Sequence, residues 1–144
     1  MKRRLQFSLI YLLVAVGLIA ACLGWWTNDS FERSVNAVLR QGGAVSYNDR
    51  VVYVSFTPCM PSGAAESWTH RHGDGNATGD LTLVFDDLKT LADQRQFLKM
   101  EFSNEAEADS CRRYFEGLPT DKYQVRFSER GPGWWVLAVK QIGR

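Results

Sequence analysis

The sequence predicts an α+β protein, in which an N-terminal transmembrane helix precedes a small α/β sandwich-type domain that ends in a β-α-β-β unit. Three observations predict this fold. The chain opens with a long uncharged apolar run, stretches with helical periodicity follow it, and alternating runs of β-branched and aromatic residues lie between them. The 144 residues are 45% hydrophobic and 23% charged, which excludes collagen-like, disordered and disulfide-scaffold classes.

The first predicted element is a membrane anchor over residues 1–26. The uncharged run from Leu5 to Trp26 would span about 33 Å as a helix, the thickness of a bilayer's hydrocarbon core. Trp25 and Trp26 close the run as interfacial aromatics, and the basic residues Lys2 to Arg4 favour a cytoplasmic N-terminus. We therefore expect an uncleaved signal-anchor that crosses the membrane once, with the remainder of the chain outside the cytoplasm.

Three alternatives for this run stay open. A cleavable signal peptide would use Ala20 and Cys22 around its cleavage site, but its apolar stretch is usually shorter. The segment Ile19 to Cys22 resembles a lipoprotein signal with an acylated cysteine, although the run stays apolar beyond Cys22. Small residues with helical spacing could instead face another membrane helix; these are Gly17, Ala21 and Gly24.

Residues 27–43 predict an amphipathic helix that packs on the domain. Asp29 and Glu32 have the spacing of a capping box, and Gly42 with Gly43 supplies the end. Its apolar stripe consists of Phe31, Val35, Val38 and Leu39.

The predicted domain covers residues 44–144 and begins with a hairpin from Ala44 to Phe56, turning at residues 48–50. The Gly- and Pro-rich segment 57–80 predicts a long flexible loop, a length that is usually functional or disordered. Whether Leu81 to Phe85 forms a strand or a helix is left open. The following helix has an apolar face formed by Val84, Leu88, Leu91 and Ala92.

The C-terminal β-α-β-β unit starts with an alternating strand at Phe97. Asn104 and Glu107 predict the start of the next helix, whose inner face holds Ala108, Cys111, Phe115 and Leu118. Two further strands begin at Tyr123 and at Trp134, and of the adjacent pair Trp134 and Trp135 one should fill the core. If the strands from Phe97 and Tyr123 are parallel neighbours, their crossover should be right-handed, with the helix on one face of the sheet.

The loop contains the candidate metal ligands. His70 and His72 lie two residues apart, so on an extended segment both imidazoles would point the same way toward Zn²⁺ or Cu²⁺, with Asp74 following. The stretch from Asp74 to Phe85 also follows part of an EF-hand Ca²⁺ loop, but Phe85 stands where that loop has its bidentate glutamate. Solvated loop side chains are the simpler interpretation.

Cys59 and Cys111 form a candidate disulfide if the domain lies in an oxidising compartment. The alternative is two half-buried thiols, with Cys111 on the inner face of its helix.

No motif for catalysis or for phosphate binding occurs, and the acidic residues are explained by helix starts. We expect a protein that is not an enzyme and has no cofactor. The near-neutral charge also gives no reason to expect a nucleic-acid partner. The predicted function is a membrane-anchored binding or structural module with an unknown protein partner. The alternative is a metal-binding protein or an enzyme that uses the loop from His70 to Asp80.

Two partial resemblances add to this interpretation. The first half, from the apolar run through residues 34–47 to the strand VVYVSF, resembles short membrane-anchored proteins of unknown function from planctomycete-type bacteria, and DLKTLADQRQFLKMEFSN is similar to one leucine-rich repeat. This likeness implies an eroded repeat relative in a bacterial inner membrane. The segment from Phe97 to Gln141 resembles the β-α-β-β unit of ribonuclease-regulator-B-like ferredoxin-type domains. That second likeness informs the fold alone.

Overall fold

A computed structural model describes residues 2–57, 68–73 and 80–143, with side chains from residue 9 onward. The α+β prediction is confirmed: a long helix leads into a domain with a six-stranded mixed sheet. In chain order the elements are α1 (Lys2–Arg40), β1 (Ala44–Tyr47), β2 (Val51–Ser55), β3 (Thr69–His72), the 3₁₀ helix η1 (Leu81–Val84), α2 (Phe85–Gln94), β4 (Phe97–Phe102), α3 (Glu105–Glu116), β5 (Tyr123–Gly131) and β6 (Trp134–Gln141).

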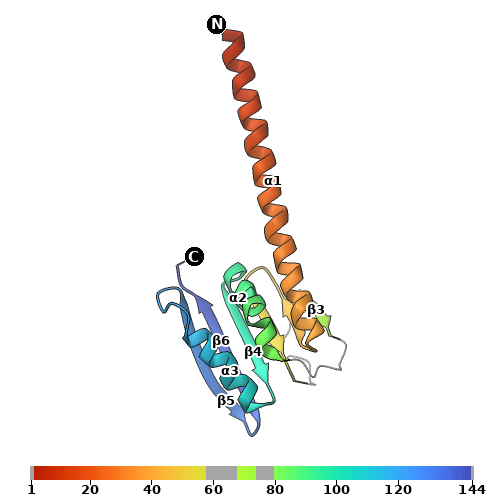
Figure 1. Cartoon of the computed structure of the whole chain (residues 1–144), viewed down its shortest axis with the longest axis vertical. Coiled ribbons are helices and arrows are strands. Elements are labelled where there is room, and N and C mark those ends of the chain that lie inside the picture. Colours follow the sequence, from red (N-terminus) through yellow and green to blue (C-terminus); the bar gives the residue numbers. More distant parts are fainter. Residues whose placement is uncertain (1, 58–67, 74–79, 144) are drawn as a thin grey trace.

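Helix α1 runs without a break from the apolar run into the domain (Figure 1). The sequence predicted a new helix opening at Asp29, and this is wrong, because Asp29 lies inside α1 and its carboxylate pairs with Arg33 at 2.9 Å. No glycine or proline lies between Trp25 and Arg40 to interrupt the helix. Extending an existing helix also avoids the cost of nucleating a second one.

The two halves of α1 have different surroundings. Large apolar side chains between Leu9 and Trp26 are exposed, whereas the predicted stripe from Phe31 to Val38 is buried in the domain core. Among the described residues, α1 is the one helix long and apolar enough to cross a membrane, which fits a membrane anchor or a signal sequence. The predicted packing of the second half against the domain is confirmed.

The strands pair in the order β3-β1-β2-β4-β6-β5. The predicted hairpin is confirmed as β1 and β2, which pair antiparallel around a turn where Asn48 Oδ1 accepts two backbone hydrogen bonds. Strand β2 is parallel to β4, and every other pairing is antiparallel. The segment 57–80 is not all loop, because β3 within it adds an edge strand to β1.

The C-terminal unit is a split β-α-β arrangement. Strands β4 and β5 are both antiparallel to β6, which lies between them, so they are parallel to each other but not neighbours. Helix α3 begins as predicted at Asn104, whose side chain accepts a hydrogen bond from Ala106 N. The open question at Leu81 resolves as a 3₁₀ turn capped by Asp80.

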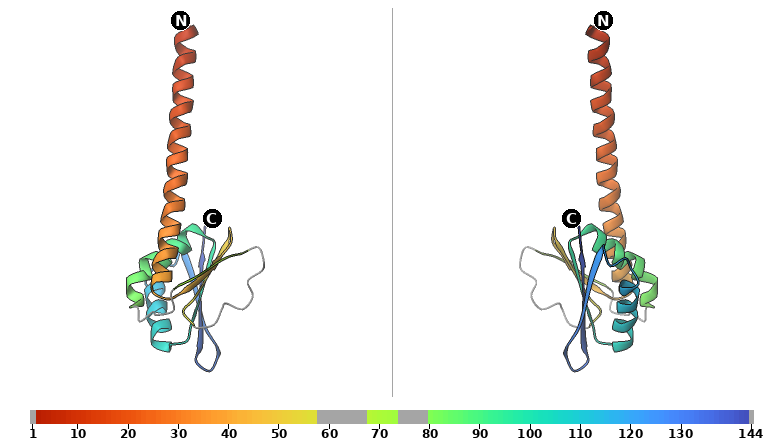
Figure 2. Two further views of the ribbon diagram at one scale, coloured as in Figure 1. Left: turned by 90° about the vertical axis from the view of Figure 1, so that its right-hand side faces the viewer. Right: turned by 90° about the vertical axis from the view of Figure 1, so that its left-hand side faces the viewer.

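All three α-helices of the domain lie on one side of the sheet, with the C-terminal part of α1 beside α2 (Figure 2). Between them and the sheet lies a single core, which includes Val52, Val54, Leu98, Met100, Phe102, Leu137 and Val139 from the strands, and Val35, Val38, Leu88, Leu91, Cys111 and Phe115 from the helices. Trp135 packs against this core while Trp134 is exposed, as the sequence predicted. Among residues 2–57, 68–73 and 80–143, no helix lies on the opposite side of the sheet.

Candidate functional site: a basic groove on the helix-free sheet face

The helix-free face carries the alternate residues of each strand. Because successive side chains point to opposite faces, burying Leu98 and Met100 under the helices places Phe97, Lys99 and Glu101 on the other side. The same alternation on β5 sends Gln124, Arg126, Ser128 and Arg130 to that side, and the register with β4 sends Val136, Ala138 and Lys140 of β6 there too.

A shallow groove of about 380 Å³ lies on this face along β6. We call it the basic groove, and it is lined by Phe97, Lys99, Gln124, Arg126, Ser128, Arg130, Val136, Ala138 and Lys140. Four of these nine residues are cationic and none is acidic. The groove is therefore a concentration of positive charge on a protein whose net charge is only +1.

The strand register gives the groove a narrow floor and charged walls. Ala138 of β6 is directly opposite Lys99 on one side and Arg126 on the other. Adjacent strands are about 4.8 Å apart, so the backbones bearing these two cations are about 10 Å apart with only a methyl group between them. Lys99 and Arg126 therefore flank the floor of the groove, and the Lys99 ammonium itself contacts Tyr53 of β2.

Lys99 is the most enclosed cation of the groove, with a side chain 16% exposed. Its Nζ donates to Tyr53 Oη, lies 4.4 Å from the Tyr53 ring centroid and is 3.5 Å from Glu101 Oε1. Burial lowers the pKa of Lys99, and the nearby positive charge of Arg130 lowers it further, against the opposing effect of Glu101. The protonated amine is therefore under-compensated, and an added anion would stabilise it.

The remaining three cations have no carboxylate partner among the described residues. No carboxylate oxygen of the described chain lies within 4.0 Å of the charged nitrogens of Arg126, Arg130 or Lys140. Their exposed positions keep the charged groups hydrated and available. With arginine forks and ammonium groups facing one groove, the arrangement suits binding of a carboxylate, sulfate or phosphate group.

The predicted metal ligands are only partly described. His70 and His72 do point to the same face of β3, opposite Ser46 and Ala44 respectively. His70 Nδ1 lies 2.9 Å from Ser46 Oγ, which occupies one of its two ring nitrogens. Asp74 lies outside the described residues, and within the described ranges no group of three metal-type ligands gathers. Metal binding by this segment stays a prediction.

Cys111 is a free thiol, fully buried on the inner face of α3, and its Sγ lies 3.7 Å from Met100 Sδ. A buried free thiol at Cys111 is the alternative that the sequence analysis gave beside the disulfide. Cys59, its proposed partner, lies outside the described residues. Burial raises the pKa of the Cys111 thiol to about 12, so the group is inert at neutral pH.

Sequence reasoning missed the basic groove. A signal was present, since Arg126 and Arg130 alternate with Val125 and Phe127 along one strand. Polar residues on alternate positions are also typical of any solvated strand, so the pattern alone does not single out a site. The signal that was lacking is the register that sets Lys99 and Lys140 beside these arginines.

Comparison with known proteins finds no family model, no curated protein and no solved structure that matches this chain.

Proposed function

We propose that this protein is a single-pass membrane-anchored binding module, with its domain outside the cytoplasm and the basic groove as its binding surface for an anionic ligand. The anchoring part is supported by the exposed apolar half of α1 and its unbroken passage into the domain core. The binding part is supported by the layout of the described residues, in which three α-helices cover one face of the sheet and the basic groove lies on the other.

One observation carries the choice of ligand class. Four cations line a groove without a lining carboxylate, and one of them, Lys99, is partly buried beside Arg130. Holding like charges together costs free energy in the unbound protein, and a bound anion offsets that cost.

Binding without catalysis is the simplest activity for this site. Its lining residues include no histidine, cysteine or carboxylate, and Lys99, the one candidate base, is engaged with Tyr53 and Glu101. Ser128 is the one hydroxyl among the described residues that line the groove, and the Lys99 amine contacts Tyr53 and Glu101 instead of it. The ligand would therefore be held by charge and released unchanged.

The test is a calorimetric titration in which tripolyphosphate is added to the full chain in detergent micelles. The double variant Arg126→Gln/Arg130→Gln should bind about tenfold more weakly, because two charge-assisted contacts are lost. The charge-matched control is Arg33→Gln/Arg113→Gln, whose two side chains are exposed and belong to helices. Equal weakening in both variants, or no binding by the unaltered chain, would show that the groove is not a specific anion site.

A further inference from the structure

A second polar groove lies where α1 leaves the apolar run. One face of α1 contributes residues at helical spacing, and the C-terminal end of α2 closes the other side. We call this the helix groove; it measures about 430 Å³ and is lined by Gly24, Thr27, Asn28, Phe31, Gln94 and Arg95. It is separate from the basic groove, with which it shares no lining residue.

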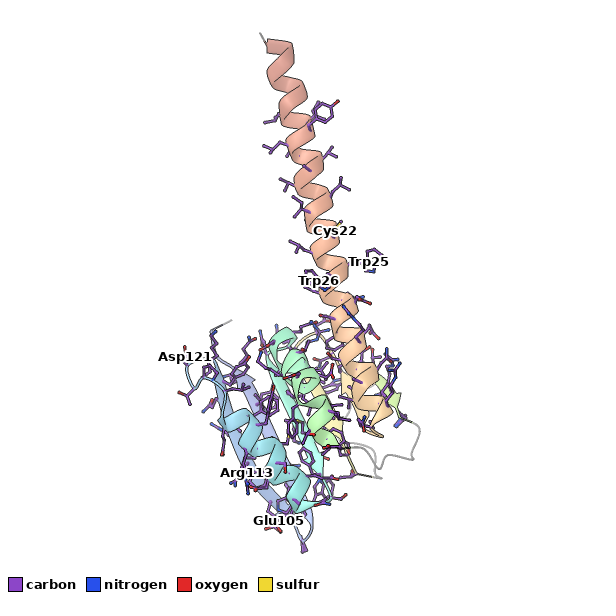
Figure 3. All side chains as sticks on the ribbon, in the orientation of Figure 1. Cys22, Trp25, Trp26, Glu105, Arg113 and Asp121 are labelled. Atoms are coloured by element: carbon purple, nitrogen blue, oxygen red, sulfur yellow. The ribbon has the colours of Figure 1, made fainter. Side chains whose placement is uncertain are left out.

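The position of the helix groove along α1 sets how far it lies from the hydrocarbon core of the bilayer. From Trp26 to Phe31 a continuous helix rises about 7.5 Å. The interfacial layer between hydrocarbon and water is about 5–7 Å thick on each side of a bilayer. Figure 3 shows Trp25 and Trp26 on α1 just beyond the domain, with Asp121 at this end of the domain and Glu105 at the far end. If the apolar run spans the bilayer, the helix groove lies among the lipid headgroups.

Arg95 supplies the charge in the helix groove and is held in a fixed position. Its guanidinium carbon lies 4.2 Å from the Phe31 ring centroid, Nε donates to Asn48 O at 3.1 Å and Nη1 donates to Gln94 O at 3.2 Å. No carboxylate of the described residues pairs with it, and its Nη2 has no hydrogen-bond partner among them. A preorganised guanidinium with free donors is a ligand for a phosphate group.

The rest of the helix groove suits the same occupant. Gly24 leaves open space, since a Cβ added there would meet no atom within 4 Å. Thr27 and Asn28 add polar groups on the same side of α1, one turn nearer the domain. A lipid could therefore place its glycerol and upper acyl chain beside Gly24 and its phosphate toward Arg95.

We propose that the helix groove binds the headgroup of an anionic phospholipid, with Arg95 as the phosphate ligand. The proposal rests on the membrane anchoring proposed above. Because α1 enters the core as a rigid helix, a lipid held between α1 and α2 fixes how the domain stands on the membrane surface. The basic groove then keeps a defined orientation relative to the membrane, because the domain cannot rotate freely on its anchor.

The experiment uses the full chain in detergent micelles with an equal mixture of phosphatidylglycerol and phosphatidylcholine, and counts retained lipids by native mass spectrometry. We expect phosphatidylglycerol to be retained about fivefold more than phosphatidylcholine, because both carry a phosphate but the choline cation of phosphatidylcholine offsets its attraction to one arginine. Arg95→Gln should abolish the preference. Arg113→Gln removes one charge from the exposed surface of α3, outside the helix groove, and should keep the preference.

A second variant keeps the test independent of folding. Gly24→Leu places a bulky side chain in the open part of the helix groove, where an added Cβ meets no atom within 4 Å, so it should also remove the preference. Thermal unfolding of this variant should match that of the unaltered chain. Glycerol phosphate, which lacks acyl chains, should not displace the lipid. Equal retention of both lipids by the unaltered chain, or a preference that survives Arg95→Gln, overturns the proposal. Alkaline extraction of membranes tests the anchoring separately. A chain that resists extraction but shows no lipid preference overturns the lipid proposal and leaves the anchoring intact.

Discussion

The arginines and lysines of the domain differ in what they contact, and this difference separates structural charges from functional ones. Arg71 bonds Glu32 at 2.6 Å and Asn36 at 2.7 Å, so its charge joins β3 to α1. Lys89 pairs with Asp93 at 2.7 Å within α2. Lys99 also has a carboxylate neighbour, Glu101 Oε1 at 3.5 Å, but its side chain is enclosed on the helix-free face and the positive charge of Arg130 opposes that contact. Charges that already have partners add little to binding, whereas an under-compensated one favours an anion.

Lys99 should make anion binding depend on pH. Its pKa in the folded protein is below the ordinary 10.5, so it loses its charge at a lower pH than a free lysine does. Affinity for sulfate should fall as pH rises through that pKa, while folding stability should rise over the same window because the unfolded chain binds more protons there. Calorimetry at a series of pH values up to the ordinary lysine pKa of 10.5 measures the fall. The variant Lys99→Gln should lack it; a fall of the same size in that variant would assign the titration to another group.

At the scale of elements, the short strand β3 is attached to α1 as well as to β1. Gly73, just after β3, donates its N–H to Gly43 O at 3.2 Å, and a Cβ at Gly73 would lie only 2.1 Å from Leu39 O. The close approach explains why glycine stands at this position. The backbone contact at Gly73 and the Arg71–Glu32 ion pair together hold the edge of the sheet against the end of α1.

Gly73→Ala should therefore destabilise the domain by about 2 kcal/mol, because the new methyl group forces the strand away from α1. Urea unfolding of the full chain in detergent, followed by tryptophan fluorescence, measures the change. Gly131→Ala is the matched control, since a Cβ there meets nothing within 4 Å and needs no left-handed backbone. Similar stability of both variants would contradict the tight contact between β3 and α1.

At the scale of the whole molecule, one helix serves two environments. Its first part exposes Leu12, Leu13, Leu18 and Ile19, and its second part buries Val35 and Val38 in the domain. Because no flexible linker separates them, the domain should sit directly on the membrane surface. A cleaved signal would release the domain, and acylation at Cys22 would anchor it by lipid instead.

The unaltered chain should stay in the membrane fraction after alkaline carbonate washing, because a spanning helix holds it by hydrophobic burial rather than by charge. A tag after Arg144 should be open to protease in intact spheroplasts. Cys22→Ser should behave identically, since the anchor does not depend on acylation. Release by carbonate, or a mature protein that lacks the apolar run, would contradict the anchored arrangement.

Local periodicity was enough to predict most elements of this fold. Three of these elements depend on residues only a few positions apart, so the sequence alone predicts them. They are the stripe from Phe31 to Val38, the cap at Asn104 and the alternation in β4. The continuity of α1 through Asp29 was missed, because a capping motif within a helix looks the same as one that starts it. Strand β3 was missed because its pattern is polar and it forms only by pairing with β1.

The sequence by itself determined the apolar run, the amphipathic helices and the inner face of the sheet, since burial imposes a pattern that repeats along the chain. Only the tertiary structure decided the order of the strands, the single side on which all three helices pack, and so which cations face the open groove. Lys99 and Arg126 are far apart in sequence, and strand register alone places them on either side of Ala138. Long-range pairing depends on the balance of many weak contacts at once, and no local pattern records it.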